Sequence, residues 1–316
     1  MFLTLKRFIV VILVGFIIAI LIILIVARFY EVSLANIIKT INIEALAIFI
    51  ILLFIAETLR AYRLKLLVSR YNKCSLPSSI IGRWSGSLLS VSTPTIGGGE
   101  ALRGVIAACT ISAQAIGSGI IDGALDFIAN YLLAIIFLPL SLLLYPSTIH
   151  AIIIALLITL PVFLFWLFII SSNGHNNLVK KLPFANRIGV DRLRKLVVSI
   201  KLDKSLFVKA FILTIIAWSL DALNLAYFAS QTSITGFIDA YIALVYSLLL
   251  GVLPTPGGAG PVDSLLATLI NPVTAISWRL LRILVMTAGG SIAFTLALAL
   301  CGPTLVGYLS KRHNNR

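Results

Sequence analysis

Long apolar runs constrain this chain more than any other feature of its sequence. Six of them approach the length of about 20 residues that an α-helix needs to cross a bilayer. Inside a bilayer the backbone must satisfy its own hydrogen bonds, which only helices and closed barrels do. The predicted spans are 8–28, 42–58, 124–145, 148–171, 206–229 and 282–308.

The composition indicates the same class of protein. Of 316 residues, 60% are hydrophobic and 11% are charged, and the mean hydropathy is +1.09; soluble domains carry about 25% charged residues. The first run is longer than the apolar part of a cleaved signal peptide, about 7–15 residues, and no small-residue cleavage site follows it. We therefore expect an all-α integral membrane protein, a polytopic helical bundle.

The formal net charge is +14, and the places where the basic residues cluster predict the orientation of this bundle. Basic residues cluster at Lys6 and Arg7, in 59–73, in 172–205 and in the C-terminal tail. Because cytoplasmic loops are enriched in Lys and Arg, both termini are expected in the cytoplasm of a multi-pass cell-membrane protein. Nucleic-acid binding is not expected, since no basic face is interleaved with aromatic stacking residues.

Two further apolar regions, 79–121 and 237–274, are broken by glycine and proline. Two clean spans already complete the round trip between residues 73 and 172, so 79–121 must enter and leave on the cytoplasmic side. The same count makes 237–274 dip in from outside. This predicts about six full spans and two oppositely oriented re-entrant hairpins, with two full spans in place of a hairpin as the alternative.

The two breaks echo each other. Pro94–Gly99 and Pro254–Ala259 share four of six residues at an offset of 160, and each precedes a carboxylate, Glu100 or Asp263. Chance similarity of Gly/Pro-rich motifs is the alternative, but breaks at corresponding places in two halves are typical of inverted repeats. We expect a single transmembrane domain over 1–316: a first half of about 1–171, the cytoplasmic basic loop 172–205, and a second half of about 206–316.

A broken helix frees backbone amides inside the membrane, and these bind anions together with the positive end of the helix dipole. Arg103 follows Gly99 by about one helical turn and can bind a phosphate that the glycine amides also touch. A phosphate-bearing lipid headgroup is the anion most available there; close helix packing is the alternative role of the glycines. The candidate headgroup-binding residues are Gly97, Gly98, Gly99, Glu100, Arg103, Pro254, Pro256, Gly257, Gly258, Gly260 and Asp263.

Other charges at membrane depth are expected to support this site. Asp122 and Asp126 share a helix face and suit the balancing of a cavity cation or the carrying of a proton. Asp221 is expected to pair with Arg279 or Arg282, with snorkelling of the arginines as the alternative. The supporting charges are thus Asp122, Asp126, Asp221, Arg279 and Arg282, whereas Arg60 and Arg63 are expected at the cytoplasmic interface.

The sequence shows no cofactor or metal motif. Cys74, Cys109 and Cys301 are scattered and are interpreted as packing residues. No Walker motif is present, so we do not expect ATP hydrolysis.

The motifs together resemble the lysylphosphatidylglycerol synthase/flippase transmembrane family over most of the chain. The resemblance lies in "RAYRLKLL", "TPTIGGGEALRG", "LPTPGGAGPVD" and the late "WRLLR" followed by a glycine pair. It assigns headgroup roles to Gly98, Gly99, Glu100, Arg103, Pro254, Pro256, Gly257, Gly258, Gly260 and Asp263, the last in place of the family's glutamate.

The chain also departs from the family pattern. The family often carries Glu-Arg-x-x-Asp after the first hairpin, but here the arginine is missing between Asp122 and Asp126. Either Arg279 or Arg282 matches the family's late arginine.

The resemblance implies a stand-alone, flippase-like member without the synthase domain. We expect a lipid flippase or transporter, not an enzyme, that moves an anionic phospholipid or a polyprenyl-phosphate-linked lipid. The alternatives are a membrane-embedded lipid-phosphate enzyme and a non-transporting accessory subunit of a glycosyltransferase or lipid-modifying system. The expected partners are membrane lipids, with a homo-oligomer or complexes with lipid-modifying or glycosylation enzymes left open.

Overall fold

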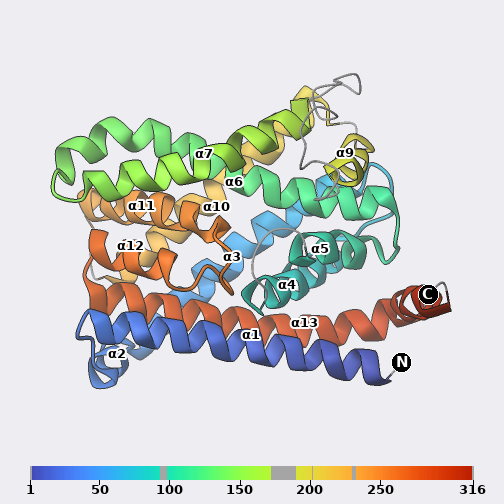
Figure 1. The fold of residues 1–316 in the computed structure, drawn as a ribbon, viewed down its shortest axis with the longest axis horizontal. Helices are drawn as coiled ribbons and strands as arrows, with labels where there is room; N and C mark the ends of the chain where they lie inside the picture. The colour runs from blue at the N-terminus through green and yellow to red at the C-terminus, as the bar shows by residue number, and fades with distance from the viewer. Residues whose placement is uncertain (1, 93–97, 172–189, 201, 230–232, 315–316) are drawn as a thin grey trace.

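The structure, a computed structural model, describes residues 2–92, 98–171, 190–200, 202–229 and 233–314. These parts form a bundle of helices (Figure 1). The helices are α1 (Phe2–Phe29), α2 (Leu34–Thr40), α3 (Ile43–Val68), α4 (Leu76–Ser92), α5 (Gly98–Ala108), α6 (Ala113–Leu144), α7 (Ile149–Ser171), α9 (Val190–Val198), α10 (Lys204–Phe228), α11 (Ile234–Leu249), the 3-10 helix η2 (Leu250–Val252), α12 (Pro261–Leu269) and α13 (Pro272–Asn314).

Among the described residues, six helices are long and apolar enough to cross a membrane by length and composition: α1, α6, α7, α10, α11 and α13. Helices α2 and α3 pass the same test as a pair bent by 75°. Helix α3 carries the charged residues Glu57, Arg60 and Arg63, which lower its hydropathy. The expected all-α polytopic membrane architecture is confirmed.

Three of the predicted spans have different ends in the structure. Helix α3 continues to Val68 rather than ending near 58; α6 begins at Ala113 rather than near 124; α13 begins at Pro272 rather than near 282. The added turns hold charged residues or glycines that are buried against other helices. Hydropathy counts the polarity of such residues but not their packing, and so it places the helix ends too early or too late.

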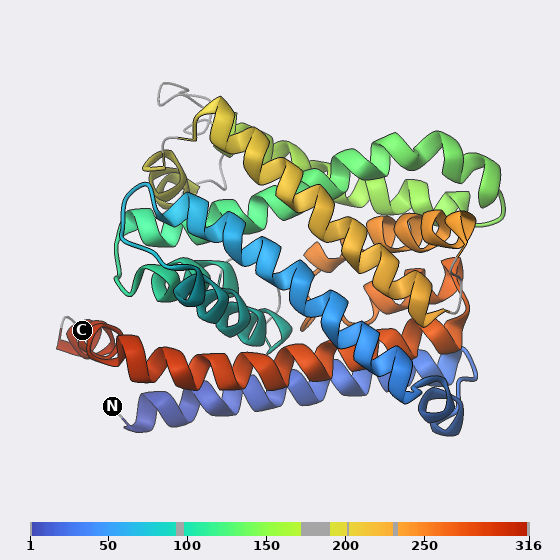
Figure 2. The same ribbon diagram turned by 180° about the vertical axis from the view of Figure 1, so that it is seen from behind.

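Two helical hairpins enter the bundle from opposite ends (Figures 1 and 2). Helices α4 and α5 enter from the end that holds both termini; α11, η2 and α12 enter from the end where α1 meets α2. The first hairpin is shorter than the predicted region 79–121, because the residues from 113 onward belong to α6. The re-entrant course in a membrane and the inverted repeat stay predictions, since α11 is itself long enough to be a span.

Glycines bring the backbones of α4, α5 and α6 into contact. A Cβ on Gly104 of α5 would stand 1.8 Å from the carbonyl oxygen of Ala115, and one on Gly119 of α6 would stand 2.0 Å from that of Glu100. On α4, a Cβ on Gly86 would stand 2.2 Å from Cγ of Arg103. Small residues at these contacts let membrane helices approach closely. The packing fixes the helix that carries Glu100 and Arg103.

A polar link joins α3, α10 and α13 at the core of the bundle. The fully buried Trp278 donates through Nε1 to Oδ1 of Asn224 at 2.8 Å. Nδ2 of Asn224 in turn donates to the carbonyl oxygen of Phe49 at 2.9 Å. Buried polar groups that are satisfied in this way specify one arrangement of their helices.

The cysteines were expected to act only in packing, and for two of them this is wrong. Cys109 after α5 and Cys301 of α13 form a disulfide across 192 residues of sequence. Their distance along the chain hides this pairing from a motif search. Cys74, between α3 and α4, is not in a disulfide.

The basic segment 172–205 is described only in part, because 172–189 and 201 lie outside the described residues. Its helix α9 packs on α6, where a Cβ on Gly117 would stand 2.2 Å from the carbonyl oxygen of Leu196. Asp203 then caps α10; the backbone N–H of Leu206 and the nearby arginine Arg70 lower the pKa of this carboxyl group.

Candidate functional site

The second Gly/Pro break is a tight turn between η2 and α12. Gly257, Gly258 and Gly260 have positive φ angles of 60°, 72° and 93°, which glycine adopts without steric strain. Asp263 accepts the Gly260 N–H at 2.8 Å and so caps α12. Arg279 of α13 donates through Nε to Asp263 at 2.9 Å and through Nη2 to the carbonyl oxygen of Gly257. The turn is thereby fastened to α13.

The amides of this turn are used within the turn itself. Gly258 donates to the carbonyl oxygen of Thr255 at 3.1 Å, and Ala259 donates to that of Pro256 at 3.0 Å. The Gly260 amide binds a side chain, as described above. These three amides are not available to an anion in this conformation.

The first break is described at its edges only, because 93–97, including Gly97, lie outside the described residues. Where α5 begins, a Cβ on Gly99 would stand 2.5 Å from the carbonyl oxygen of Gly86 on α4. Glycine is required there for the two arms to meet. The next residue, Glu100, is thereby placed between α4 and α6.

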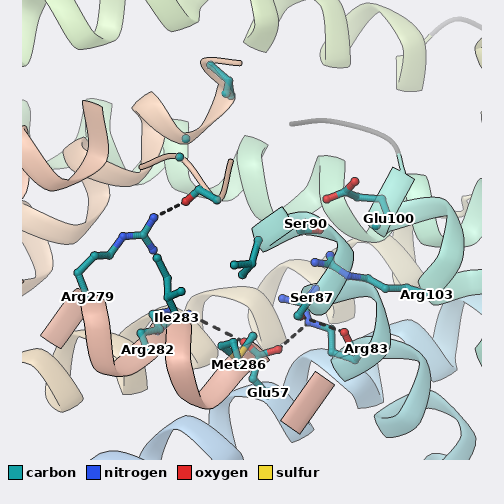
Figure 3. A pocket seen from close by; sticks show the side chains of 16 residues that line it. Glu57, Arg83, Ser87, Ser90, Glu100, Arg103, Arg279, Arg282, Ile283 and Met286 are labelled. Atoms are coloured by element: carbon teal, nitrogen blue, oxygen red, sulfur yellow. Dashed lines mark hydrogen bonds and ion pairs between the residues drawn. The ribbon is translucent and has the colours of Figure 1, made fainter. Parts of the chain in front are cut away.

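Both breaks border one cavity of about 280 Å³ (Figure 3). They nearly touch: a Cβ on Gly257 would stand 3.4 Å from the carbonyl oxygen of Val91, at the end of α4. In Figure 3, Arg279 and Arg103 lie on opposite sides of the cavity. Four arginines, two glutamates and two serines form its polar lining: Glu57, Arg83, Ser87, Ser90, Glu100, Arg103, Arg279 and Arg282.

The structure brings five of the predicted headgroup-binding residues to this cavity, together with both late arginines. Gly260 and Asp263 lie behind the lining and shape the second break. Gly98 is the first residue of α5. Pro254 and Pro256 are not among the described lining residues. The predicted residues that line the cavity are Gly99, Glu100, Arg103, Gly257, Gly258, Arg279 and Arg282.

Four polar lining residues were not assigned to the site from sequence: Glu57, Arg83, Ser87 and Ser90. Glu57 could have been found in the sequence as a glutamate inside an apolar run. Arg83 could have been found as a charged residue in "GRWSG", where small residues indicate close helix packing.

Glu57 is the centre of one group of ion pairs. It accepts hydrogen bonds from Nη1 of Arg60 at 2.9 Å and from Nε of Arg83 at 2.8 Å. Arg60 also donates to Asp221 at 2.6 Å. Arg60 is only 2% exposed, so its predicted place at the cytoplasmic interface is wrong. The physical reason is that carboxylates on α3 and α10 satisfy its charge inside the bundle.

Asp122 and Asp126 belong to a second group, on α6. Arg63 of α3 donates through Nε to Asp122 and through Nη1 to Asp126, both at 2.7 Å. Arg83 adds a bond to Asp122 at 3.0 Å. Arg63 is fully buried, so its predicted interfacial place is also wrong. The two aspartates do share a face, since a single arginine bridges them.

The late arginines have different partners. Arg282 donates to both oxygens of Asp221, at 2.9 and 3.2 Å, as one of the two expected pairings. Arg279 instead holds Asp263.

Arg103 differs from the other lining arginines. It projects from α5 into the cavity, is 6% exposed, and its Nε has no hydrogen-bond partner among the described residues. Its ion-pair contact, Asp122 Oδ2, is 3.8 Å from Nη1 and already binds Arg83. A buried polar donor without an acceptor costs about 1–3 kcal/mol, and more for a charged group. In the described part of the structure, the Nε donor of Arg103 is thus left unsatisfied.

Fold and site together define a polytopic helical membrane protein with an arginine-lined cavity. A family model described as "Lysylphosphatidylglycerol synthase TM region" matches residues 9–290. The match covers most of the chain, and the protein belongs to this family. No curated protein and no solved structure matches it.

Proposed function

We propose that this protein is a lipid transporter of the flippase type and that its cavity holds the phosphate of an anionic lipid. The observation that carries the proposal is the buried side chain of Arg103, which lines the cavity and whose Nε has no hydrogen-bond partner among the described residues. Arginine suits phosphate because its planar fork donates two parallel hydrogen bonds. Lipid tails would stay in the apolar surroundings while the headgroup passes through the cavity.

The cavity lies between the described ends of α4 and α5 and the turn that precedes α12, which favours a transport site. A site shared by two hairpins that enter from opposite ends can open toward either side when one hairpin moves against the other. Residues of both hairpins line it, with Arg103 and Gly99 on one and Gly257 and Gly258 on the other.

We also propose transport rather than catalysis. A general base needs a carboxylate that is ready to take a proton from the substrate. Glu57, Asp122, Asp126, Asp221 and Asp263 each accept hydrogen bonds from buried arginines. These partners hold the five carboxylates in place as counter-ions for the arginines.

The proposal further places the protein in the cell membrane, with both termini in the cytoplasm and membrane lipids as its partners. The basic clusters on the cytoplasmic side of the predicted spans support this orientation. They also suit contact with the anionic lipids of the inner leaflet.

The test is lipid translocation in proteoliposomes with Arg103→Ala. Tail-labelled phosphatidylglycerol and a tail-labelled polyprenyl phosphate serve as probes, and a membrane-impermeant quencher reports which leaflet they occupy. We expect the variant to lose about tenfold or more of the transport rate, because the phosphate loses its charged hydrogen bonds.

The matched control is Arg28→Ala, which removes an exposed arginine at the end of α1. It is expected to transport as the wild type does. Equal transport rates for Arg103→Ala and the wild type would overturn the role given to Arg103.

A further inference from the structure

A second cavity, of about 150 Å³, lies beside the arginine-lined one. It is lined by residues of α5, α6, α7, α9 and η2. Helix α9 lies toward the end of the molecule that holds both termini (Figure 1). Its walls are mainly aliphatic and aromatic: Ile120, Ala124, Phe127, Phe165, Trp166 and Leu193.

The two cavities share part of their lining. Glu100 of α5 and Val252 of η2 line both. The side chain of Glu100 packs against Gly123 of α6, where any larger residue would clash, since a Cβ there would stand 2.5 Å from Cγ of Glu100. The carboxylate therefore stands at the boundary between a charged cavity and an apolar one. A ligand with an anionic head and an apolar tail fits the pair.

We propose that the apolar cavity receives the first part of the hydrocarbon of the lipid whose phosphate lies in the arginine cavity, and that this lipid carries one chain joined directly to its phosphate, as an isoprenoid phosphate does. This inference rests on the proposed function. The arginine cavity by itself does not distinguish an anionic phospholipid from an isoprenoid phosphate, and the apolar cavity favours the isoprenoid phosphate.

The size of the apolar cavity favours a single chain. Its volume, about 150 Å³, is roughly half of the 280 Å³ of the headgroup cavity. A diacyl lipid brings two chains to the same point, a few bonds from its phosphate. An isoprenoid phosphate brings only one.

The chemistry of the walls favours the same class. A diacyl lipid would carry two ester carbonyl groups toward this cavity, and a buried acceptor needs a donor. Among the described lining side chains, only the indole of Trp166 has an N–H to donate. The first isoprene unit has no ester and needs none. The walls thus accept an isoprenoid chain without burying an unsatisfied ester carbonyl of the ligand.

The experiment measures lipid binding to the full-length protein in detergent, by native mass spectrometry with competition. The probes are geranylgeranyl phosphate and dioleoyl phosphatidylglycerol. Leu193→Trp and Phe165→Trp fill the apolar cavity from two different helices. Val198→Trp is the matched control, because Val198 lies on the same helix as Leu193 but is 41% exposed.

We expect the wild type to prefer geranylgeranyl phosphate. Both filling variants should weaken its binding about tenfold, the size of an ordinary overpacking penalty, while Val198→Trp has no effect. Agreement between the two filling variants excludes a local folding defect of either helix.

The other outcomes separate this inference from the proposed function. If Arg103→Ala weakens binding of geranylgeranyl phosphate but the two filling variants do not, the apolar cavity does not bind the hydrocarbon, and the proposed phosphate site in the arginine cavity stands. If none of these variants has an effect, both fail. Equal wild-type affinity for phosphatidylglycerol would overturn the single-chain assignment.

Discussion

At the scale of residues, the interior of this protein is held by arginines that each bind more than one acid. Arg63 joins Asp122 to Asp126, and Arg83 joins Glu57 to Asp122. Buried pairs of this kind add little net stability over apolar residues, but removing one partner leaves a buried charge uncompensated. Single substitutions here should therefore be far more harmful than the pairs are stabilising.

Arg63→Leu tests this directly. It should destabilise the protein by about 3–5 kcal/mol, because Asp126 loses its two shortest hydrogen bonds. This corresponds to a fall of roughly 10 °C in apparent Tm in detergent. Adding Asp126→Asn should recover part of the loss, and Arg28→Leu on the surface should cost almost nothing. A double variant no more stable than Arg63→Leu would contradict the uncompensated charge as the cause.

Arg60 and Arg63 show which part of the site could not be predicted from the sequence. "RAYRLKLL" follows an apolar run, and hydropathy alone cannot tell arginines that face headgroups from arginines that face a bundle. The deciding partners are distant: Asp122 lies 59 residues from Arg63, and Asp221 lies 161 residues from Arg60. Glycine and proline motifs, by contrast, are local, and five of the eleven residues that they singled out line the cavity.

At the scale of elements, the two breaks were visible in the sequence because glycine and proline interrupt apolar runs at both. Their stabilising contacts were not visible. Arg279, on a different helix, fastens the second break through Asp263 and the carbonyl oxygen of Gly257. Likewise, the glycine-rich start of α6 was assigned to a hairpin, because a buried helix that packs through glycines has low hydropathy.

Asp263→Ala should loosen the start of α12. It removes the N3 side chain that accepts the Gly260 N–H in a capping box, together with the acceptor of Arg279 Nε, and the loss of a capping side chain costs about 1–2 kcal/mol. Amide hydrogen exchange in the first turn of α12 should therefore speed up about 5–30-fold. Ser233→Ala, which removes the cap of α11, should speed exchange only in its own helix. Unchanged exchange in α12 for Asp263→Ala would contradict the capping role.

At the scale of the whole molecule, the two hairpins correspond in one more respect. Glu100 is the third residue of α5, and Asp263 is the third residue of α12. The two carboxylates nevertheless have different surroundings. Asp263 accepts a hydrogen bond from Arg279, whereas Glu100 lines both cavities. This difference between the two hairpins suits the proposed ligand, which has a phosphate head and an apolar tail.

The orientation of the whole bundle is tested at Cys74, which lies between α3 and α4 on the side predicted to face the cytoplasm. In a Cys109→Ser/Cys301→Ser background it is the one remaining cysteine. A membrane-impermeant maleimide should label it in inside-out vesicles and not in sealed right-side-out vesicles. Cys74→Ser gives the background signal. Labelling only in right-side-out vesicles would invert the topology and, with it, the side from which α4 and α5 enter.

The pH dependence of that labelling follows from the surroundings of the thiol. Partial burial raises the pKa of Cys74 above its usual range, against a smaller opposing effect of the Ser79 hydroxyl. Only the thiolate reacts, so a raised pKa means slow labelling at neutral pH and a rate that climbs about tenfold per pH unit through the alkaline range. A rate that levels off near pH 8 would show that the thiol is more exposed than this contact between α3 and α4 allows, and that the hairpin stands away from the end of α3.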